Sequence, residues 1–188
     1  MQAFCPADLQ LRDGEDVEII INSCGGSVYA ASEIYTRLKQ HTGKTTGVIS
    51  SHALSAATLI AMGVQHLCIA PTADFMVHNV SAGGRYGDYH VHAKTADVLK
   101  QANDTLANAY ALKTRRSKAD ILELMDKESW LTPAQALELG FVDEILFTDD
   151  QTLPLIAAQA AMLPMEVITG MQRKKLAIEL DLLALERR

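Results

Sequence analysis

Short apolar runs alternate with amphipathic segments over most of this chain. Residues 17–21 are rich in β-branched side chains and show little polar alternation, which predicts a buried strand ending in a turn that contains Gly25 and Gly26. Beyond the turn, apolar residues recur at helical spacing over residues 28–38, directly after the capping residue Ser27. The pattern therefore predicts a strand, a tight turn and a helix.

A second unit of the same kind follows, in which residues 50–54 connect a strand to a helix of small side chains. Two more strand-like runs come next, and the second one ends at His78. The predicted elements are a strand at 47–49, a helix at 55–62 and strands at 66–69 and 75–77. Because strands that alternate with helices usually pair in parallel, this order predicts an α/β fold of repeated strand-turn-helix units with a largely parallel sheet.

The remaining pattern is mainly helical. A long amphipathic helix is expected over residues 88–113 and a shorter one over residues 118–125. The sequence Thr-Pro-Ala-Gln has a capping residue, a proline at the first helical position and a glutamine at the third, which predicts a helix over residues 132–139. A final short strand is expected over residues 141–147.

The composition changes after this predicted strand. A charged break is followed by an apolar stretch with two prolines and then by a heavily charged helical pattern that runs to the end of the chain. We therefore expect one domain over residues 1–147 and a helical arm, suited to contacts with neighbouring subunits, over residues 148–188.

Composition and charge narrow the class of protein. The chain has 188 residues, of which 48% are hydrophobic and 21% charged, with a net charge of −6. These proportions are those of a globular protein, and the acidic balance argues against a nucleic-acid partner. No run reaches the ~18 apolar residues of a membrane helix, and the first residues do not resemble a signal peptide. We expect a cytoplasmic protein without membrane contact.

The sequence does not predict a metal or cofactor site. Its three cysteines follow no disulfide or zinc-finger spacing. Asp88, His90 and His92 are metal-ligand types, but the alternate spacing of the two histidines places them on different faces of a predicted helix. We therefore expect a protein that uses neither a metal ion nor a cofactor.

Two turns between a strand and a helix are suited to hold negative charge, because backbone N–H groups point outward there. Ser55 begins its predicted helix, so its hydroxyl lies beside the free N–H of Ala56. The turn at Gly25 and Gly26 admits a close carbonyl because no Cβ blocks it. These features make Ser55 a candidate nucleophile, although a serine at a helix start is often only a cap and a Gly-Gly turn is often only structural.

Candidate acid–base groups follow from the same pattern. His78 ends a predicted strand, where a side chain can emerge at the rim of a cleft and act as a base toward a serine. Asp126 and Glu128 both precede the capped helix, and each is a candidate to orient that histidine. The local sequence does not choose between the two carboxylates.

Together these segments resemble a known family, the proteolytic subunits of Clp protease (ClpP), and within it the phage and prophage branch of head maturation proteases. The similarity runs in order and with similar spacing from residue 4 to residue 146. The segments that carry it are INSCGGSV at 21–28, SAATLIAM at 55–62, MVHN at 76–79, WLT at 130–132 and GFVDEI at 140–145.

The resemblance implies a ClpP/crotonase-like fold with a long oligomerisation helix, and a serine endopeptidase that works through a Ser-His-acid triad. Ser55 falls on the family's nucleophile, His78 on its general base and Glu128 on its acid position. Gly26 and Ala56 fall on the two backbone donors of the oxyanion hole. The implied partners are a polypeptide substrate, further copies of the chain in a ring and, for the phage branch, capsid or scaffold proteins.

Three departures from the family pattern bear on these expectations. Cys24 stands where the family usually has proline, and we interpret it as tolerated rather than catalytic. Residues 50–54 replace a more usual Gly-x-Ala-Ala sequence before the serine and bring in His52 as a competing base. A counterpart of the family's N-terminal strand and axial segment is missing from the sequence, which leaves docking of an unfolding ATPase open.

Two further hypotheses belong to other functional classes. The first is a catalytically inactive subunit of the same fold that forms rings or acts as a scaffold. The second is a crotonase-type acyl-CoA enzyme, since two backbone donors also stabilise an enolate. Under the second hypothesis Ser55 and His78 have no role, so the peptidase is the function we expect.

Overall fold

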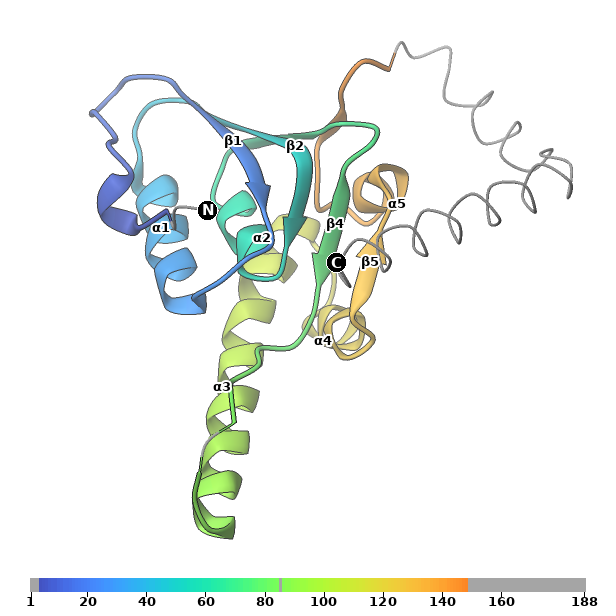
Figure 1. The fold of residues 1–188 in the computed structure, drawn as a ribbon. Coiled ribbons are helices and arrows are strands. Elements are labelled where there is room, and N and C mark those ends of the chain that lie inside the picture. The colour runs from blue at the N-terminus through green and yellow to red at the C-terminus, as the bar shows by residue number, and fades with distance from the viewer. Residues whose placement is uncertain (1–3, 85, 149–188) are drawn as a thin grey trace, which may run out of the picture. The chain divides into compact units, whose positions relative to one another are not determined.

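A computed structural model of the chain describes residues 4–84 and 86–148 (Figure 1). In chain order its elements are η1 (Pro6–Asp8), β1 (Val17–Ser23), α1 (Val28–Gln40), β2 (Thr45–Leu54), α2 (Ala56–Ala61), β3 (His66–Ile69), β4 (Asp74–Val77), α3 (Tyr89–Thr114), α4 (Lys118–Asp126), β5 (Ser129–Leu131), α5 (Pro133–Glu138) and β6 (Glu144–Ile145). The predicted alternation of strands and helices is confirmed.

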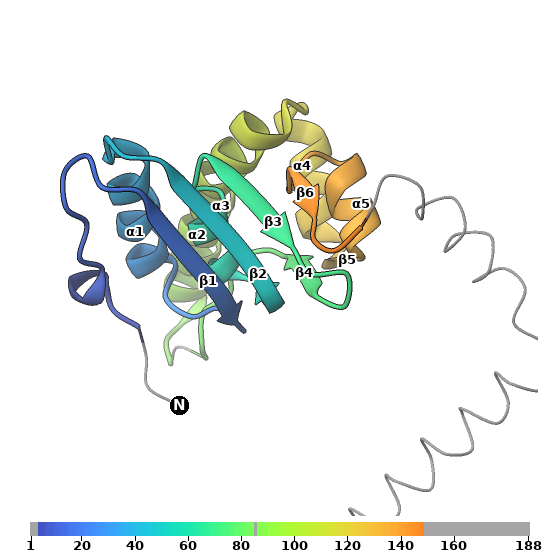
Figure 2. The same ribbon diagram turned by 90° about the horizontal axis from the view of Figure 1, so that it is seen from above.

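The six strands form one mixed sheet in the order β5-β4-β2-β3-β6, with β1 paired to β2. The pairs of β2 with β1, β3 and β4 are parallel, as is the pair β3–β6, whereas β4 and β5 are antiparallel. Figure 2 shows β1, β2 and β3 side by side with α1 and α2 on one face. The largely parallel sheet is therefore confirmed, with one antiparallel strand that the sequence pattern did not predict.

Strand β2 is the centre of this arrangement because it changes neighbours along its length. Its first half pairs with β1 and β3, so that Ile49 lies between Ile21 and Ile69. Its second half pairs with β4, where Ala53 lies opposite Phe75. The carboxyl ends of β1, β2 and β4 consequently meet at one place on the sheet edge.

The prediction of a short strand at 47–49 with a connection at 50–54 was wrong. The strand continues to Leu54, although Ser50, Ser51 and His52 interrupt its apolar pattern. The side chains of Ser50 and Ser51 are exposed, and pairing with β4 extends the ladder beyond the point where β3 leaves. The connection to α2 is thereby reduced to the single residue Ser55.

The core lies between one face of the sheet and the helices. Alternate residues of β1, β2 and β3 face the helices, among them the fully buried Ile49 and Leu67. The opposite face at these strands is partly open, and Ile20 on β1 is 68% exposed there. The sheet therefore has one face packed on the core and one face accessible to other molecules.

The long helix α3 is buried only along its second half. Its buried residues are Leu106, Ala107, Ala109 and Tyr110, whereas the first half extends away from the sheet (Figure 1). Apolar side chains are exposed on that extension, including Tyr89 and Val98. The predicted long helix is thus confirmed, and none of the residues in its first half is fully buried in the part of the chain that the structure describes.

The end of the compact unit differs in detail from its prediction. The expected strand at 141–147 is reduced to the two residues of β6, because Phe141 and Val142 are buried beside α5 rather than paired in the sheet. The predicted C-terminal arm lies outside the described residues except for Thr148. Among the described helices, none is long and apolar enough to cross a membrane.

Candidate active site

Ser55 turns the chain from β2 into α2 with an unusual backbone. Its φ of 56° and ψ of −129° lie in a region that residues other than glycine rarely adopt. Its N–H donates a hydrogen bond to the carbonyl of Met76, 3.0 Å away, on the adjacent strand β4. The sharp turn between strand and helix is therefore fixed by the sheet and presents a serine hydroxyl at its tip.

His78 meets Ser55 at this turn. It directly follows β4, whose Met76 pairs with Leu54 at the end of β2. The two adjacent strands thus deliver the two side chains to the same edge, and His78 Nε2 lies 2.7 Å from Ser55 Oγ. Both residues are half-buried. A histidine at this distance from a serine hydroxyl can accept its proton.

The turn after β1 packs against the same serine. Gly25 has a φ of +99°, and a Cβ on it would lie 2.7 Å from both the Leu54 carbonyl oxygen and Ser55 Cβ. Only glycine fits this contact. Among the described residues, the backbone N–H groups of Gly26 and Ala56 have no hydrogen-bond acceptor. Two unpaired donors therefore belong to segments that pack together beside the Ser55 side chain.

A buried pair of hydroxyl groups supports the Ser55 turn from below. Thr58 Oγ1 donates a hydrogen bond of 2.5 Å to the Ser55 carbonyl and lies 2.7 Å from Tyr110 Oη on α3. Burial raises the pKa of Tyr110 to about 12, so its hydroxyl stays protonated at neutral pH. The pair was missed in the sequence, because its members are 52 positions apart and belong to no local pattern.

Replacing Tyr110 by phenylalanine is expected to lower the free energy of unfolding by about 1 kcal/mol, the usual contribution of one buried neutral hydrogen bond. Chemical denaturation measures this change. Tyr35→Phe is the matched control, because the Tyr35 hydroxyl makes no hydrogen bond among the described residues, and we expect it to stay within about 0.5 kcal/mol of wild type. Equal stabilities of the two variants would contradict a supporting role for the pair.

The two candidate carboxylates occupy different surroundings. Asp126 accepts a hydrogen bond of 2.8 Å from the side-chain amide of Asn79, the residue after His78. Glu128 is exposed, has a left-handed backbone with φ 48° and makes no hydrogen bond to His78 within the described residues. The structure thus joins Ser55 and His78, and it leaves the third member of the triad without a direct contact.

The pairing of β4 with β5 ends one residue before His78 on one strand and one residue after Glu128 on the other. The antiparallel pairs run from Phe75–Leu131 through Val77–Ser129. His78 and Glu128 are the next residues beyond this last pair, and Glu128 leaves the extended conformation with its φ of 48°. Asp126 lies two residues farther from this register.

His52, the competing base, is occupied elsewhere. Its Nε2 lies 3.3 Å from Cys24 Sγ, and its Nδ1 lies 3.2 Å from Ser51 Oγ. Both ring nitrogens therefore have partners other than Ser55, and the histidine that contacts Ser55 is His78.

Asp88, His90 and His92 lie at the start of α3. Asp88 caps it, since its carboxylate accepts hydrogen bonds from the N–H groups of His90 and Val91. His90 and His92 are both exposed in the first turn.

An apolar pocket of about 400 Å³ lies near the segment that follows His78, and its lining on that segment begins at Val80 and includes neither Ser55 nor His78. It is enclosed by the start of α1, by the segment that follows Asn79 and by α3. Its apolar lining comes mainly from Val28, Tyr29, Val80, Val98 and Leu99. Because Val28 and Val80 lie two residues beyond Gly26 and His78, a chain lying across the serine can place an apolar side chain in this pocket.

Comparison with known proteins agrees with these features. Residues 8–149 match the model of the family described as Clp protease. The chain is 30% identical over 146 residues to the ATP-dependent Clp protease proteolytic subunit 1 of Chlamydia abortus, a match that covers 72% of each chain. It is 28% identical over 152 residues to the ATP-dependent Clp protease proteolytic subunit of Deinococcus radiodurans, covering 78% of this chain and 72% of the relative. With its mixed six-stranded sheet and long helix, this chain belongs to the Clp protease family.

Proposed function

We propose that the protein is a serine endopeptidase in which Ser55 is the nucleophile and His78 the general base. The observation that carries the proposal is the distance of 2.7 Å between Ser55 Oγ and His78 Nε2 at the tip of a strained turn. A strained turn is costly to maintain, and such strain is concentrated at functional sites. Membership of a protease family gives the pair its chemistry.

The reaction follows from these positions. As Ser55 Oγ attacks the carbonyl carbon of a peptide bond, His78 Nε2 takes up the hydroxyl proton. His78 then gives this proton to the leaving amine, and the peptide carbonyl remains on Ser55 as an ester. A water molecule then loses a proton to His78 and attacks the ester carbon. As the bond between that carbon and Ser55 Oγ breaks and the carboxylic acid leaves, His78 returns the proton to Oγ and restores the hydroxyl.

The backbone N–H groups of Gly26 and Ala56 are proposed to bind the oxyanion that forms on the carbonyl oxygen. Both donors are unpaired among the described residues, and both lie in segments that pack around Ser55. Donors fixed in advance by the backbone stabilise the developing charge without reorganisation, and each one is typically worth a factor of about 10²–10³ in turnover.

Glu128 is proposed as the third member of the triad, with Asp126 as the alternative. The pairing of β4 with β5 supports Glu128, since the last pair of the ladder joins Val77, the residue before His78, to Ser129, the residue after Glu128. Asp126 is instead engaged by Asn79 and is suited to hold the segment after His78 in place.

Exchanging each carboxylate for its amide separates the two roles. Glu128→Gln is expected to lower kcat for peptide hydrolysis by about 100-fold or more, because His78 loses the negative charge that stabilises its protonated form. Asp126→Asn keeps the shape of the side chain and is expected to change kcat by less than about tenfold. A larger loss from Asp126→Asn than from Glu128→Gln would assign the acid role to Asp126.

Assembly and partners are proposed on the basis of the fold and the family. The exposed apolar side chains on the first half of α3, with Val98 among them, support contacts between copies of the chain in a ring. The apolar pocket that begins at Val80, two residues after His78, supports a polypeptide substrate with an apolar side chain near the cleaved bond. An ATPase partner, a role in phage head maturation and a cytoplasmic location stay predictions, as does the arm over residues 148–188.

Active-site labelling tests the proposal. Wild-type protein is treated with a fluorophosphonate probe, the modified peptide is mapped by mass spectrometry, and the mass of the assembly in solution is measured on the same sample. We expect a single phosphonylated serine at position 55 in the assembled protein, together with hydrolysis of unstructured peptides. If the assembled, folded protein took up no label, the result would favour the alternative hypothesis, a catalytically inactive, ring-forming subunit of the same fold.

A further inference from the structure

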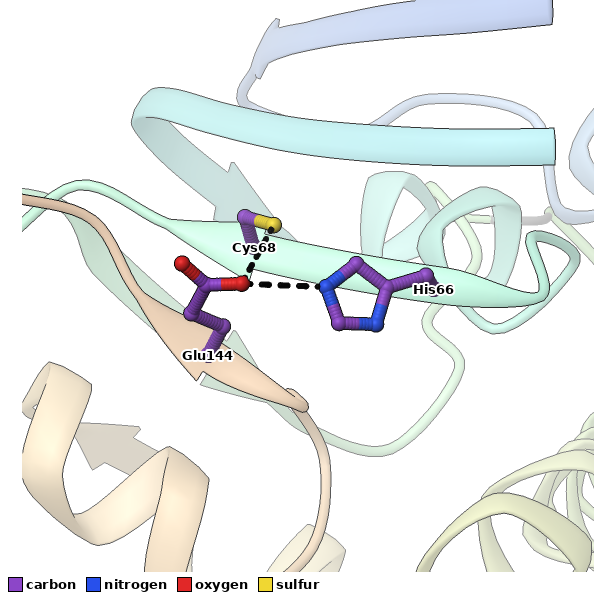
Figure 3. A group of neighbouring side chains, drawn as sticks. All are labelled: His66, Cys68 and Glu144. Atoms are coloured by element: carbon purple, nitrogen blue, oxygen red, sulfur yellow. Dashed lines mark hydrogen bonds and ion pairs between the residues drawn. The ribbon is translucent and has the colours of Figure 1, made fainter.

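Three potential metal ligands lie together on the open face of the sheet, away from Ser55. His66 and Cys68 are on β3, two residues apart and hence on the same face, and Cys68 pairs with Glu144 of β6. Figure 3 shows the Glu144 carboxylate between the His66 ring and the Cys68 sulfur. The register of two parallel strands therefore gathers an imidazole, a thiol and a carboxylate from segments 76 residues apart.

The distances among these groups approach those around a bound ion. His66 Nε2 lies 3.2 Å and Cys68 Sγ lies 3.9 Å from the same oxygen of Glu144, and the ligand atoms all lie within 4.8 Å of one another. In a tetrahedral zinc site, bonds of about 2.0–2.3 Å hold neighbouring ligand atoms roughly 3.3–3.7 Å apart. Small rotations of exposed side chains close the difference, since the side chains of His66 and Glu144 are 41% and 54% exposed.

A further carboxylate completes the surroundings of the histidine. Asp143 Oδ2 lies 4.0 Å from His66 Nδ1, on the opposite side of the ring from Glu144. It is fixed by hydrogen bonds from the Leu67 N–H and the Lys113 ammonium group. Metal-binding histidines commonly have such a carboxylate at their second nitrogen, where it orients the ring and raises its basicity.

We propose that His66, Cys68 and Glu144 bind a divalent transition-metal ion of borderline softness, such as Zn²⁺. One nitrogen, one sulfur and one oxygen ligand match the preference of Zn²⁺, and three protein ligands leave a fourth position for water. Cys68 is buried whereas the other two ligands are partly exposed, so the ion enters from the open face of the sheet. Bound there, it links β3 to β6 across the sheet edge.

The local charge favours a cation at this place. The carboxylates of Glu144 and Asp143 both act on the Cys68 sulfur, and Glu18 on β1 adds a third negative charge. Lys113 offsets one of these charges through its ion pair with Asp143, 2.5 Å long. Lys39 also interacts with Asp143, so two positive charges oppose three carboxylates, and the remaining excess is negative, which favours a cation.

Cobalt substitution tests the proposal on the full-length chain. The protein is treated with a chelator, desalted and titrated with Co²⁺ alone, because a cobalt–thiolate bond gives a charge-transfer band and a tetrahedral Co²⁺ gives strong visible bands. We expect both signals at one equivalent and their loss when Zn²⁺ is added. The double variant Cys5→Ser/Cys24→Ser, which keeps Cys68 as its only cysteine, must retain them.

Single ligand variants complete the test. Cys68→Ser is expected to abolish the charge-transfer band, and His66→Gln and Glu144→Gln are each expected to weaken the affinity by about 10-fold to 100-fold or more. Both of these side chains are partly exposed, so the variants are suited to retain the fold. Absence of the thiolate band in wild type, or its persistence in Cys68→Ser with loss in the double variant, would overturn the proposal.

Discussion

Ser55→Ala is expected to lower kcat/KM for peptide hydrolysis by about 10⁴-fold or more and to abolish fluorophosphonate labelling. The removed oxygen is the atom that forms the covalent ester, and His78 Nε2, 2.7 Å from it, loses its only described partner. Removing the nucleophile leaves only the acceleration supplied by the oxyanion donors and by substrate binding. Initial rates on a fluorogenic peptide measure the loss.

The control for this variant is a serine of similar local setting without the histidine contact. Ser51 lies four positions earlier on β2, is exposed and contacts His52 rather than His78. Ser51→Ala is therefore expected to keep kcat/KM within a few-fold of wild type. Unfolding curves and solution masses of both variants establish that each is folded and assembled. If Ser55→Ala hydrolysed the peptide at the wild-type rate, the nucleophile would have to be another residue.

The strand-turn-helix units could be predicted from the sequence because their signals are local. The Gly25–Gly26 turn and the helix capped by Ser27 stand as expected, and residues 17–21 form the expected strand, although it is not a buried one, because only Ile21 among them is buried. His78 could be placed for the same reason, since a strand ended by a histidine is visible in the pattern. The structure adds the pairing of β2 with β4, which brings that histidine to Ser55.

The features that escaped prediction depend on contacts between distant segments. Ser50, Ser51 and His52 suggest a loop by their polarity, yet the neighbouring strand β4 keeps them in β2. The three-residue strand β5 is too short to give a periodic signal, and its pairing places Ser129 opposite Val77, the residue before His78. Pairing across the sheet, rather than local propensity, decides these cases.

The proposed metal site illustrates the same limit. A His-x-Cys pair on a strand is no recognised metal motif, and its third ligand, Glu144, comes 76 residues after Cys68. Because the sequence contains no familiar spacing of metal ligands, it predicts no metal site. Only the parallel register of β3 and β6 reveals that the three side chains share one face.

Gly25→Ala is expected to lower the free energy of unfolding by about 2–5 kcal/mol and to reduce kcat/KM by about 100-fold or more. The left-handed backbone contributes about 1–2 kcal/mol, and the overlap with the Leu54 carbonyl oxygen and Ser55 Cβ, both 2.7 Å from the new methyl group, contributes a further ~1–3 kcal/mol. Relief of the overlap moves the turn away from Ser55, and displacement of a catalytic group by about 1 Å typically costs 10²-fold in rate. Denaturation and peptide hydrolysis measure both effects.

Gly14→Ala separates the two causes, because Gly14 also has a positive φ, +77°, but a methyl group there meets nothing within 4 Å. It is expected to lose only the backbone contribution, about 1–2 kcal/mol, and to keep wild-type activity. The difference in the free energy of unfolding between the two variants then measures the steric contact between the Gly25 turn and Ser55. If Gly25→Ala were no less stable than Gly14→Ala and equally active, the turn would be free to move, and its backbone could not serve as a fixed oxyanion donor.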